Sequence, residues 1–302
     1  MKCIVGAGLA GLVAAHAWPQ AAVLEASPQP TAAHRALLRF RTDGVSRLTG
    51  IEFRKVRVNK GIWSDGAFVQ SNIRVANMYA QKVLRGSMRG DRSIWRLDPV
   101  DRFIAPDTLY EQLVEAVGSR VNWATPADFV GMRTTCVSTA PLPVTLKALG
   151  IEHNLPFRRS GILVRRWKSP ESDVFQTIYY PDANTAMYRA SITGNTLIAE
   201  FVDATTDPAY DLQLLERSFG IDLGAATALP VVEQKYGKIE PVANDGVRKH
   251  LLFRLTHDHG IFSLGRFATW RNILLDDVVD DIAAIKRLSR SGAAYDLRAA
   301  TQ

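Results

Sequence analysis

A glycine-rich turn near the start of the chain carries the clearest chemistry in the sequence. Gly6, Gly8 and Gly11 stand in the spacing GxGxxG, directly after the apolar run Cys3-Ile4-Val5. Between a strand and a helix, this spacing allows a sharp turn, a close backbone approach to a pyrophosphate, and tight packing of the helix on the strand. The helix N-terminus also presents free N–H groups to the anion. The pattern therefore predicts a dinucleotide contacted by Gly6, Ala7, Gly8, Leu9, Ala10 and Gly11.

An acidic residue follows at the distance that such a site requires. The second apolar run ends in Glu25, roughly 20 residues after the first glycine, where a carboxylate accepts hydrogen bonds from a ribose. We expect Glu25 and the adjacent Ala26 to lie beside that ribose. The alternative is a glycine-rich turn in another doubly wound fold. A signal peptide does not fit, because glycines break the apolar run and no small-residue cleavage pattern follows.

Composition places the chain among ordinary soluble globular proteins. It has 302 residues, 47% of them hydrophobic and 22% charged, which is enough for two modest domains with cores of their own. No apolar run approaches the ~18 residues of a membrane span. The net charge of +7 favours an anionic partner, such as a nucleotide, a phosphate or nucleic acid.

The cysteines indicate a reducing compartment. Cys3 and Cys136 both lie in apolar, strand-like surroundings, and the sequence contains no CxxC pair. This pattern predicts neither a redox dithiol nor a zinc site, and it fits a cytoplasmic protein.

The middle of the chain has the pattern of an antiparallel sheet. Alternating residues predict strands at 51–59 and 66–72, and four further strands at 162–167, 175–180, 186–192 and 196–202. Helical patterns cover 75–84, 106–117, 211–219 and 274–288, and short buried strands cover 120–123, 136–138 and 260–264. We therefore expect a nucleotide domain of residues 1–48, 98–150 and 245–302, interrupted by a β-rich substrate domain of residues 49–97 and 151–244.

Two later segments return to the nucleotide domain. Cys136-Val137-Ser138 ends abruptly in Thr139-Ala140-Pro141, and small residues at a strand end let the backbone approach a ligand. A plain strand-to-helix turn is the alternative. The strand near residue 260 leads through Gly265 and Arg266 to a final helix, whose N-terminus can stabilise negative charge on a ligand.

Several polar residues near the C-terminal end have ordinary explanations. Asp276, Asp277, Asp280 and Asp281 fall in the first turns of the last helix, where solvated aspartates match the helix dipole better than they suggest a metal site. His257 and His259 are expected in a polar turn. No metal ion is expected.

Three islands of sequence together resemble the FAD-dependent amine oxidases and UDP-galactopyranose mutases. These are GAGLAG with Glu25, the strand end VSTAPLP, and SLGRFATWRNILLDDVVDDI. The resemblance implies an α/β fold, with a Rossmann-like FAD-binding domain and an inserted, mainly antiparallel β-sheet substrate domain. The chain departs from the family pattern at Trp270, in place of a tyrosine, and at Asn272-Ile273-Leu274-Leu275, in place of a "YYDM"-like segment. The glycine pair that usually follows the acidic residue is also missing.

The resemblance implies FAD as the cofactor and assigns positions to it. Thr139, Ala140 and Pro141 would lie against the cofactor, Gly265 and Arg266 would reach its ribityl or phosphate region, and Asn272, Ile273, Leu274 and Leu275 would approach the flavin ring. Arg35 could face a cofactor phosphate or lie on the face of a helix. No second GxGxxG follows, so a separate NAD(P)H domain is not expected.

The substrate side leaves three functions open. The first is an oxidoreductase of the amine oxidase kind, which takes hydride from a C–N or C–H bond of a small or anionic substrate. The second is a non-redox mutase of a nucleotide sugar, and the third is an enzyme that modifies a nucleotide or nucleic acid, although no recognition motif supports it. Lys82, Lys235 and Tyr236 are candidates for catalysis, and Tyr179, Tyr188 and Arg189 for substrate binding. The oligomeric state stays open.

Overall fold

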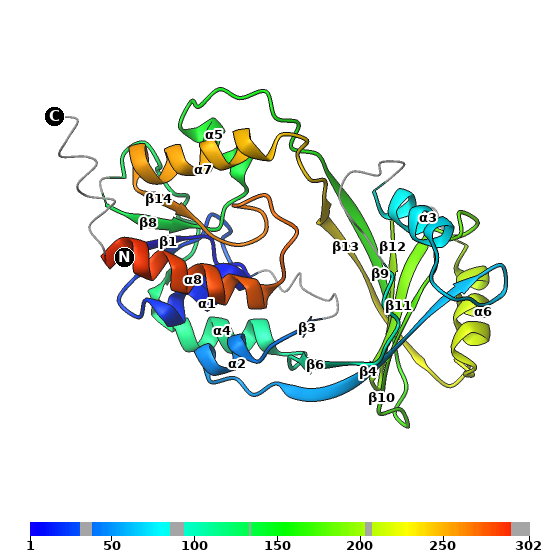
Figure 1. The fold of residues 1–302 in the computed structure, drawn as a ribbon. Coiled ribbons are helices and arrows are strands. Elements are labelled where there is room, and N and C mark those ends of the chain that lie inside the picture. Colours follow the sequence, from blue (N-terminus) through cyan, green and yellow to red (C-terminus); the bar gives the residue numbers. More distant parts are fainter. Residues whose placement is uncertain (31–37, 85–93, 133, 203–206, 291–302) are drawn as a thin grey trace.

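Two β-sheets lie side by side in the computed structural model, which describes residues 1–30, 38–84, 94–132, 134–202 and 207–290 (Figure 1). The first is a five-stranded sheet in the order β14-β8-β1-β2-β7. All its strands run parallel, with Cys3 of β1 aligned between Ala22 of β2 and Cys136 of β8. The carboxyl ends of the strands therefore meet at one edge. The strands are β1 (Cys3–Val5), β2 (Ala22–Leu24), β7 (Val121–Asn122), β8 (Cys136–Ser138) and β14 (Ile261–Ser263).

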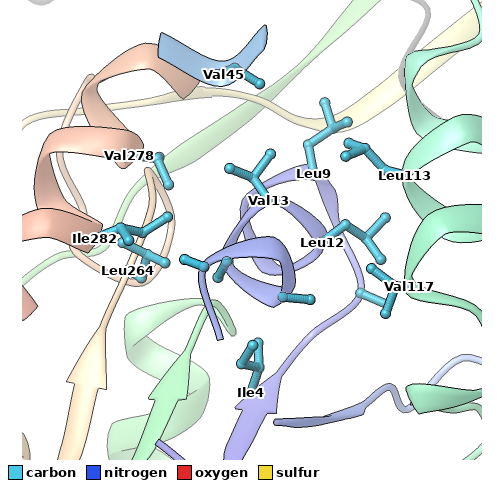
Figure 2. Packing of buried hydrophobic residues seen from close by; sticks show 14 of the residues in the cluster. Ile4, Leu9, Leu12, Val13, Val45, Leu113, Val117, Leu264, Val278 and Ile282 are labelled. Carbon is cyan, nitrogen blue, oxygen red and sulfur yellow. The ribbon is translucent and has the colours of Figure 1, made fainter. Parts of the chain in front are cut away.

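Helices cover both faces of the parallel sheet. Side chains alternate along a strand, so Ile4 faces one layer and Cys3 and Val5 face the other. Ile4 belongs to one hydrophobic cluster with side chains of α1 (Leu9–Ala17), α2 (Gly44–Thr49), α4 (Leu109–Val117) and α8 (Leu275–Arg290), as Figure 2 shows. Cys3 and Val5 pack with α5 (Leu142–Ala148) and α7 (Asp245–His259). Each fully buried side chain of this kind stabilises the fold by about 1.5–3 kcal/mol.

The second sheet has nine strands and is mostly antiparallel. Its order is β13-β9-β12-β11-β10-β4-β6-β3, and β5 pairs with β4 off this path. β4 and β10 form the one parallel pair that the described residues contribute to it. The strands are β3 (Arg39–Phe40), β4 (Arg54–Ser64), β5 (Ala67–Phe68), β6 (Val100–Ile104), β9 (Arg159–Lys168), β10 (Val174–Tyr179), β11 (Met187–Gly194), β12 (Thr196–Phe201) and β13 (Thr227–Ile239).

The two faces of the nine-stranded sheet have different partners. The helix α6 (Pro208–Phe219) packs Leu215 against Ala199 and Phe201 on one face. The helix α3 (Ile73–Val83) packs Tyr79 against Tyr188 on the other. The face with α3 also turns toward the parallel sheet, because Lys168 Nζ at the end of β9 lies 3.5 Å from Asp107 Oδ2, just before α4.

The predicted combination of a parallel nucleotide-binding sheet and an antiparallel sheet is confirmed. Some details differ: β5 spans only Ala67–Phe68 of the expected strand at 66–72, and β3 and β6 join the nine-stranded sheet. The division into two domains at the stated boundaries stays a proposal. No helix in the described part of the chain is both long enough and apolar enough to cross a bilayer.

The expected polar turn at His257 and His259 is wrong. Both residues belong to α7, whose buried positions are Arg248, Leu251 and Leu255. These three residues lie at i, i+3 and i+7 and form a narrow buried stripe. Because one of them is charged and most of the other residues are polar, the sequence shows no clear hydrophobic period of 3.6 residues. Asn244 begins the helix, since its side chain accepts a hydrogen bond from Val247 N at 3.1 Å.

Candidate functional site

The glycine turn is held by the neighbouring strand β8. Gly6 has φ +97°, and a Cβ there would stand 2.4 Å from Thr139 Oγ1. A Cβ on Gly11 would stand 1.9 Å from the carbonyl oxygen of Gly6, where no side chain fits. Thr139 in turn donates its backbone N–H and its hydroxyl to Val5 O, each at 2.8 Å. Gly6 therefore forms the sharp turn and Gly11 permits the close packing of the helix, as the sequence predicts.

The second glycine faces open space. A Cβ on Gly8 would have no heavy atom of the described residues within 4 Å, although Gly8 is the N-cap of α1 with extended backbone (φ −73°, ψ 175°). In the described part of the chain, no side chain caps the first N–H groups of this helix. The space beside Gly8 therefore adjoins the first backbone N–H groups of α1, and such a helix N-terminus can bind a phosphate. This observation fits the pyrophosphate of FAD.

Glu25 lies at the end of β2, beside this turn. Its Oε2 accepts Ala7 N–H at 2.7 Å and its Oε1 accepts Ser27 N–H at 2.8 Å. A carboxylate has about four lone-pair sites, so each oxygen keeps capacity for a ribose hydroxyl. Ala26 next to it is exposed. Glu25 therefore fixes the turn and can still bind a sugar.

The segment Thr139-Ala140-Pro141 and the Gly265-Arg266 turn meet at the same edge. Leu142 N donates to Phe267 O at 2.9 Å, and a Cβ on Gly265 (φ +87°) would stand 2.9 Å from Ala10 Cβ of α1. The backbone at residue 265 thus packs directly on the fingerprint helix. The sequence separates these segments by more than a hundred residues, and the parallel sheet brings them together.

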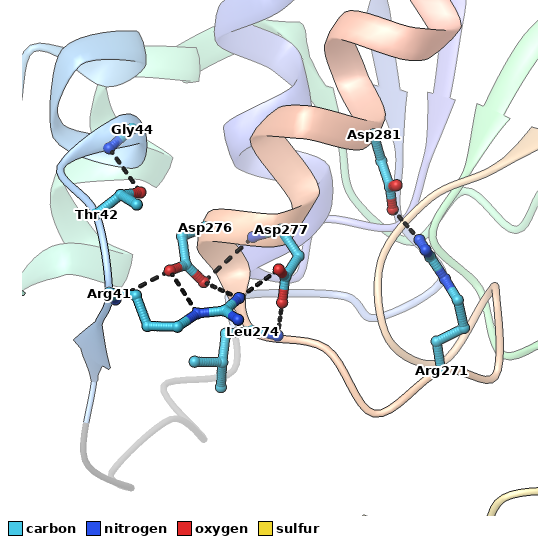
Figure 3. Close-up of polar contacts among 8 residues, drawn as sticks. All are labelled: Arg41, Thr42, Gly44, Arg271, Leu274, Asp276, Asp277 and Asp281. Carbon is cyan, nitrogen blue, oxygen red and sulfur yellow. Dashed lines mark hydrogen bonds and ion pairs between the residues drawn. The ribbon is translucent and has the colours of Figure 1, made fainter.

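The last helix begins in a network of ion pairs (Figure 3). Arg41, just after β3, donates its backbone N–H to Asp276 Oδ2 at 2.9 Å and its guanidinium to both Asp276 and Asp277. Asp277 Oδ2 accepts Leu274 N–H at 2.8 Å, and Arg271 pairs with Asp281. The expectation of solvated aspartates is wrong for Asp276, whose side chain is 3% exposed, because a distant arginine covers it.

The segment before α8 carries an unusual residue. Trp270 has φ +49°, a left-handed conformation that is rare for a bulky side chain. Its Nε1–H donates to Glu240 O at 3.0 Å, and its ring meets Phe157 edge-on at 4.9 Å. These contacts hold the turn in place. Beyond it, Asn272 and Leu274 are exposed, while Ile273 and Leu275 are half-buried, so this backbone is accessible at the start of the helix.

The sheet face that turns toward the parallel sheet is rich in cations. We call it the cationic face, and it carries Arg39, Lys60, Arg102, Arg166 and Arg189, which share one side by strand register. On it, the predicted substrate residue Arg189 pairs with Glu200, whose side chain is 3% exposed. The same carboxylate accepts the Tyr188 hydroxyl at 2.9 Å.

The three predicted substrate residues thus gather on one face but differ in access. Tyr188 is fully buried, and burial together with the Glu200 carboxylate raises the pKa of its phenol well above the ordinary value. Its hydroxyl donates to the Glu200 carboxylate, and the side chain is not exposed to a substrate at the surface. Tyr179 and Arg189 are half-buried neighbours in register, and the Tyr179 ring meets Tyr79 edge-on at 5.4 Å.

Lys82 has a structural set of partners. Its ammonium donates to the backbone carbonyls of Tyr180, Asp182 and Met187, at 2.8, 2.7 and 2.5 Å. These bonds fasten α3 to the connection between β10 and β11. Burial lowers the pKa of Lys82 to about 7, opposed by the carboxylates of Asp182 and Asp211. A catalytic role for Lys82 stays a prediction.

Three other predicted residues cannot be placed. Arg35 lies outside the described residues, and so do the side chains of Lys235 and Tyr236, although their backbone belongs to β13. Conversely, the sequence did not single out Arg39, Arg41, Thr177 or Glu200. Only the alternation of Glu200 along its strand could have placed it on the same face as Arg189.

Solved structures share this fold. Reduced UDP-galactopyranose mutase superposes with a TM-score of 0.62 at 13% identity, over 95% of each chain. A putrescine oxidase variant gives 0.54 at 13% identity, over 99% of this chain and 98% of that one. A geranylgeranyl bacteriochlorophyll reductase-like protein from Thermoplasma acidophilum gives 0.52 at 10% identity, over 98% and 79%. The predicted resemblance is confirmed at the level of fold.

Sequence comparison adds nothing to this likeness. No family model matches the chain, and no curated protein matches its sequence.

Proposed function

We propose that this chain is a flavoenzyme that binds FAD at the carboxyl edge of the parallel sheet and oxidises a C–N or C–H bond of a small anionic substrate. The observation that carries the proposal is the convergence of three backbone segments, at Gly8, Thr139 and Gly265, around a helix N-terminus with open space beside it. The likeness to UDP-galactopyranose mutase and putrescine oxidase supports it.

The residues of the chain would divide the work by position. The N–H groups at the start of α1 would bind the pyrophosphate, and Glu25 would accept ribose hydroxyls. When bound, FAD supplies a hydride acceptor at N5 of its ring system. The start of α8 would face the ring, and Arg41 would offset the negative charge of Asp276 and Asp277 there.

The substrate would lie against the cationic face. The side chain of Arg189 is 28% exposed, and the half-buried Tyr179 beside it offers a hydroxyl. Such a surface orients an anionic group and excludes water from the opposite side of the substrate. Because these cations lie on an inner sheet face, the arrangement favours a small molecule over a nucleic acid.

Anaerobic reduction of the FAD-loaded protein tests the proposed reaction. Small amines and hydroxy compounds that carry a carboxylate or phosphate are mixed with it, and the flavin absorbance near ~450 nm is followed. Bleaching by an anionic compound, but not by its uncharged analogue, is the expected result. Failure of every such compound to reduce a flavin that dithionite does reduce would contradict the oxidoreductase.

A non-redox mutase is the second candidate, favoured by the neighbouring cations Arg39, Lys60 and Arg189 and by the likeness to UDP-galactopyranose mutase. Several cations on one face suit a diphosphate. In this case the prereduced protein would isomerise a nucleotide sugar with no net oxidation, and the oxidised protein would be inactive.

A further inference from the structure

We propose that Arg39, with Thr177 and Ser191 beside it, binds an oxyanion of the substrate, a carboxylate or a phosphate. The inference rests on the proposed function for treating the cationic face as the substrate side. It goes further by naming the group that takes the charge, a residue that the sequence did not single out.

Within the described residues, the guanidinium of Arg39 donates to one hydroxyl group, on strand β10. Its Nη2 donates to Thr177 Oγ1 at 2.8 Å, and Thr177 Oγ1 lies 2.9 Å from Ser191 Oγ. Its Nη1 is buried and meets no partner in the part of the chain that the structure describes. A guanidinium offers its donors as a planar fork, which fits both oxygens of an oxyanion.

The cations around Arg39 have anionic or carbonyl partners of their own. Arg189 has Glu200 as its counter-ion, and Lys60 donates to Arg96 O at 2.7 Å. Arg39 forms no ion pair within the described ranges. Burial first, and then the charges of Arg189 and Arg102, lower the pKa of Arg39 to about 10, although Tyr179 and Glu200 act in the opposite direction.

At neutral pH Arg39 is therefore a half-buried cation with a buried Nη1, and it has no carboxylate partner among the described residues. Such a group costs stability unless something compensates it. A bound oxyanion would supply both the missing charge and an acceptor for the Nη1 donor.

Its place in the fold suits a substrate. Two residues after Arg39 comes Arg41, which binds Asp276 at the first turn of α8. Arg39 thus belongs to the cationic face and lies two residues from the side chain that contacts the helix start, which we assign to the flavin ring.

Thermal unfolding of the FAD-loaded protein with inorganic phosphate or acetate tests this site, because FAD then fills the pyrophosphate position. Sodium chloride at equal ionic strength corrects for screening. The Tm of the wild type should rise with one or both probes, and Arg39→Met should weaken the apparent Kd about tenfold or more, since hydrogen bonds to charged groups are strong. Arg39→Lys, which keeps the charge without the fork, should be intermediate.

Arg57→Met is the matched control. Arg57 lies on β4 with its side chain 63% exposed, pairs with Asp101, and points to the opposite face from Val56 and Val58. It should respond to phosphate like the wild type. Equal responses from Arg39→Met and Arg57→Met would overturn the proposal.

Stability without phosphate gives an independent readout. Arg39→Met leaves no carboxylate unpaired, so its Tm should equal or exceed that of the wild type. Arg189→Met leaves the buried carboxylate of Glu200 without its counter-ion and should lower the Tm. A fall for Arg39→Met as large as for Arg189→Met would contradict a binding role. The rise in Tm on adding phosphate or acetate can be compared between Arg39→Met and Arg57→Met whether or not the protein retains FAD. Failure of the proposed function would be seen separately, because the protein would then lack the flavin absorption spectrum.

Discussion

Gly8 and Gly11 lie three residues apart in one turn and face different surroundings. A Cβ at residue 11 would overlap the backbone oxygen of Gly6, while a Cβ at residue 8 would meet no heavy atom of the described residues within 4 Å. Gly11→Ala should therefore lose at least about 3 kcal/mol of stability. Gly8→Ala should keep the free energy of unfolding within about 0.5 kcal/mol of the wild type. Urea unfolding measures both.

The same pair separates folding from cofactor binding. If the space beside Gly8 belongs to a pyrophosphate, Gly8→Ala should weaken FAD binding about tenfold or more, because it crowds hydrogen bonds to a charged group. A titration of FAD fluorescence measures this. Unchanged binding by a folded Gly8→Ala protein would mean that the cofactor lies elsewhere.

Glu200 gives a prediction about pH. Burial acts to raise the pKa of its carboxyl, but Arg189 outweighs burial and holds that pKa below the ordinary 4.5. The ion pair therefore stabilises the fold fully above about pH 4.5, and this stability is lost as pH falls through the lower, folded-state pKa.

Glu200→Gln should accordingly be less stable than the wild type by about 3 kcal/mol at pH 7, because Arg189 loses its counter-ion. The gap should narrow when urea unfolding is repeated below pH 4.5. Glu233→Gln, at an exposed position of β13, should show no such gap at either pH. A gap for Glu200→Gln that is constant with pH would show that the pair is not the cause.

At the scale of elements, Arg41 is the contact that joins β3 to the start of α8. Arg41→Met would leave the buried carboxylate of Asp276 without its partner, and we expect a loss of about 3 kcal/mol. The control is Arg47→Met, whose partner Asp43 lies one helical turn away on the surface, with side chains 74% and 41% exposed. Exposed pairs of this kind contribute only about 0.2–1 kcal/mol. Equal losses in chemical unfolding would contradict a structural role for the Arg41 network.

The elements also show how far sequence patterns reach. The strand at Cys3–Val5 and the turn after it could be predicted, because adjacent residues specify both. The helix α7 could not be predicted, because its buried stripe contains the charged residue Arg248. Arg248 donates a hydrogen bond of 2.7 Å to Thr269 O, which belongs to a loop distant in the sequence. Arg39 was missed for a related reason: its partner Thr177 lies 138 residues away, and no local pattern reports such a contact.

At the scale of the whole molecule, the proposed site requires both sheets. The parallel sheet gathers Gly8, Thr139 and Gly265 at its carboxyl edge, and the proposal assigns Arg39 and Arg189 of the nine-stranded sheet to the substrate side. In the proposal, neither sheet alone forms both walls. A ligand that binds across them should stabilise the fold, by roughly 2.7 kcal/mol at a concentration one hundred times its Kd. Differential scanning calorimetry with FAD should show this as a higher Tm, while NAD at the same concentration should leave the Tm unchanged.

Retention of FAD by the purified protein shows whether the carboxyl edge of the parallel sheet holds this cofactor. The protein is mixed with excess FAD, freed of unbound cofactor by gel filtration, and examined by absorption spectroscopy, with the folded variant Gly8→Ala as the control that should retain less FAD. We expect about one flavin per chain, with peaks near ~370 and ~450 nm. A folded wild-type protein that elutes without these peaks would contradict this expectation.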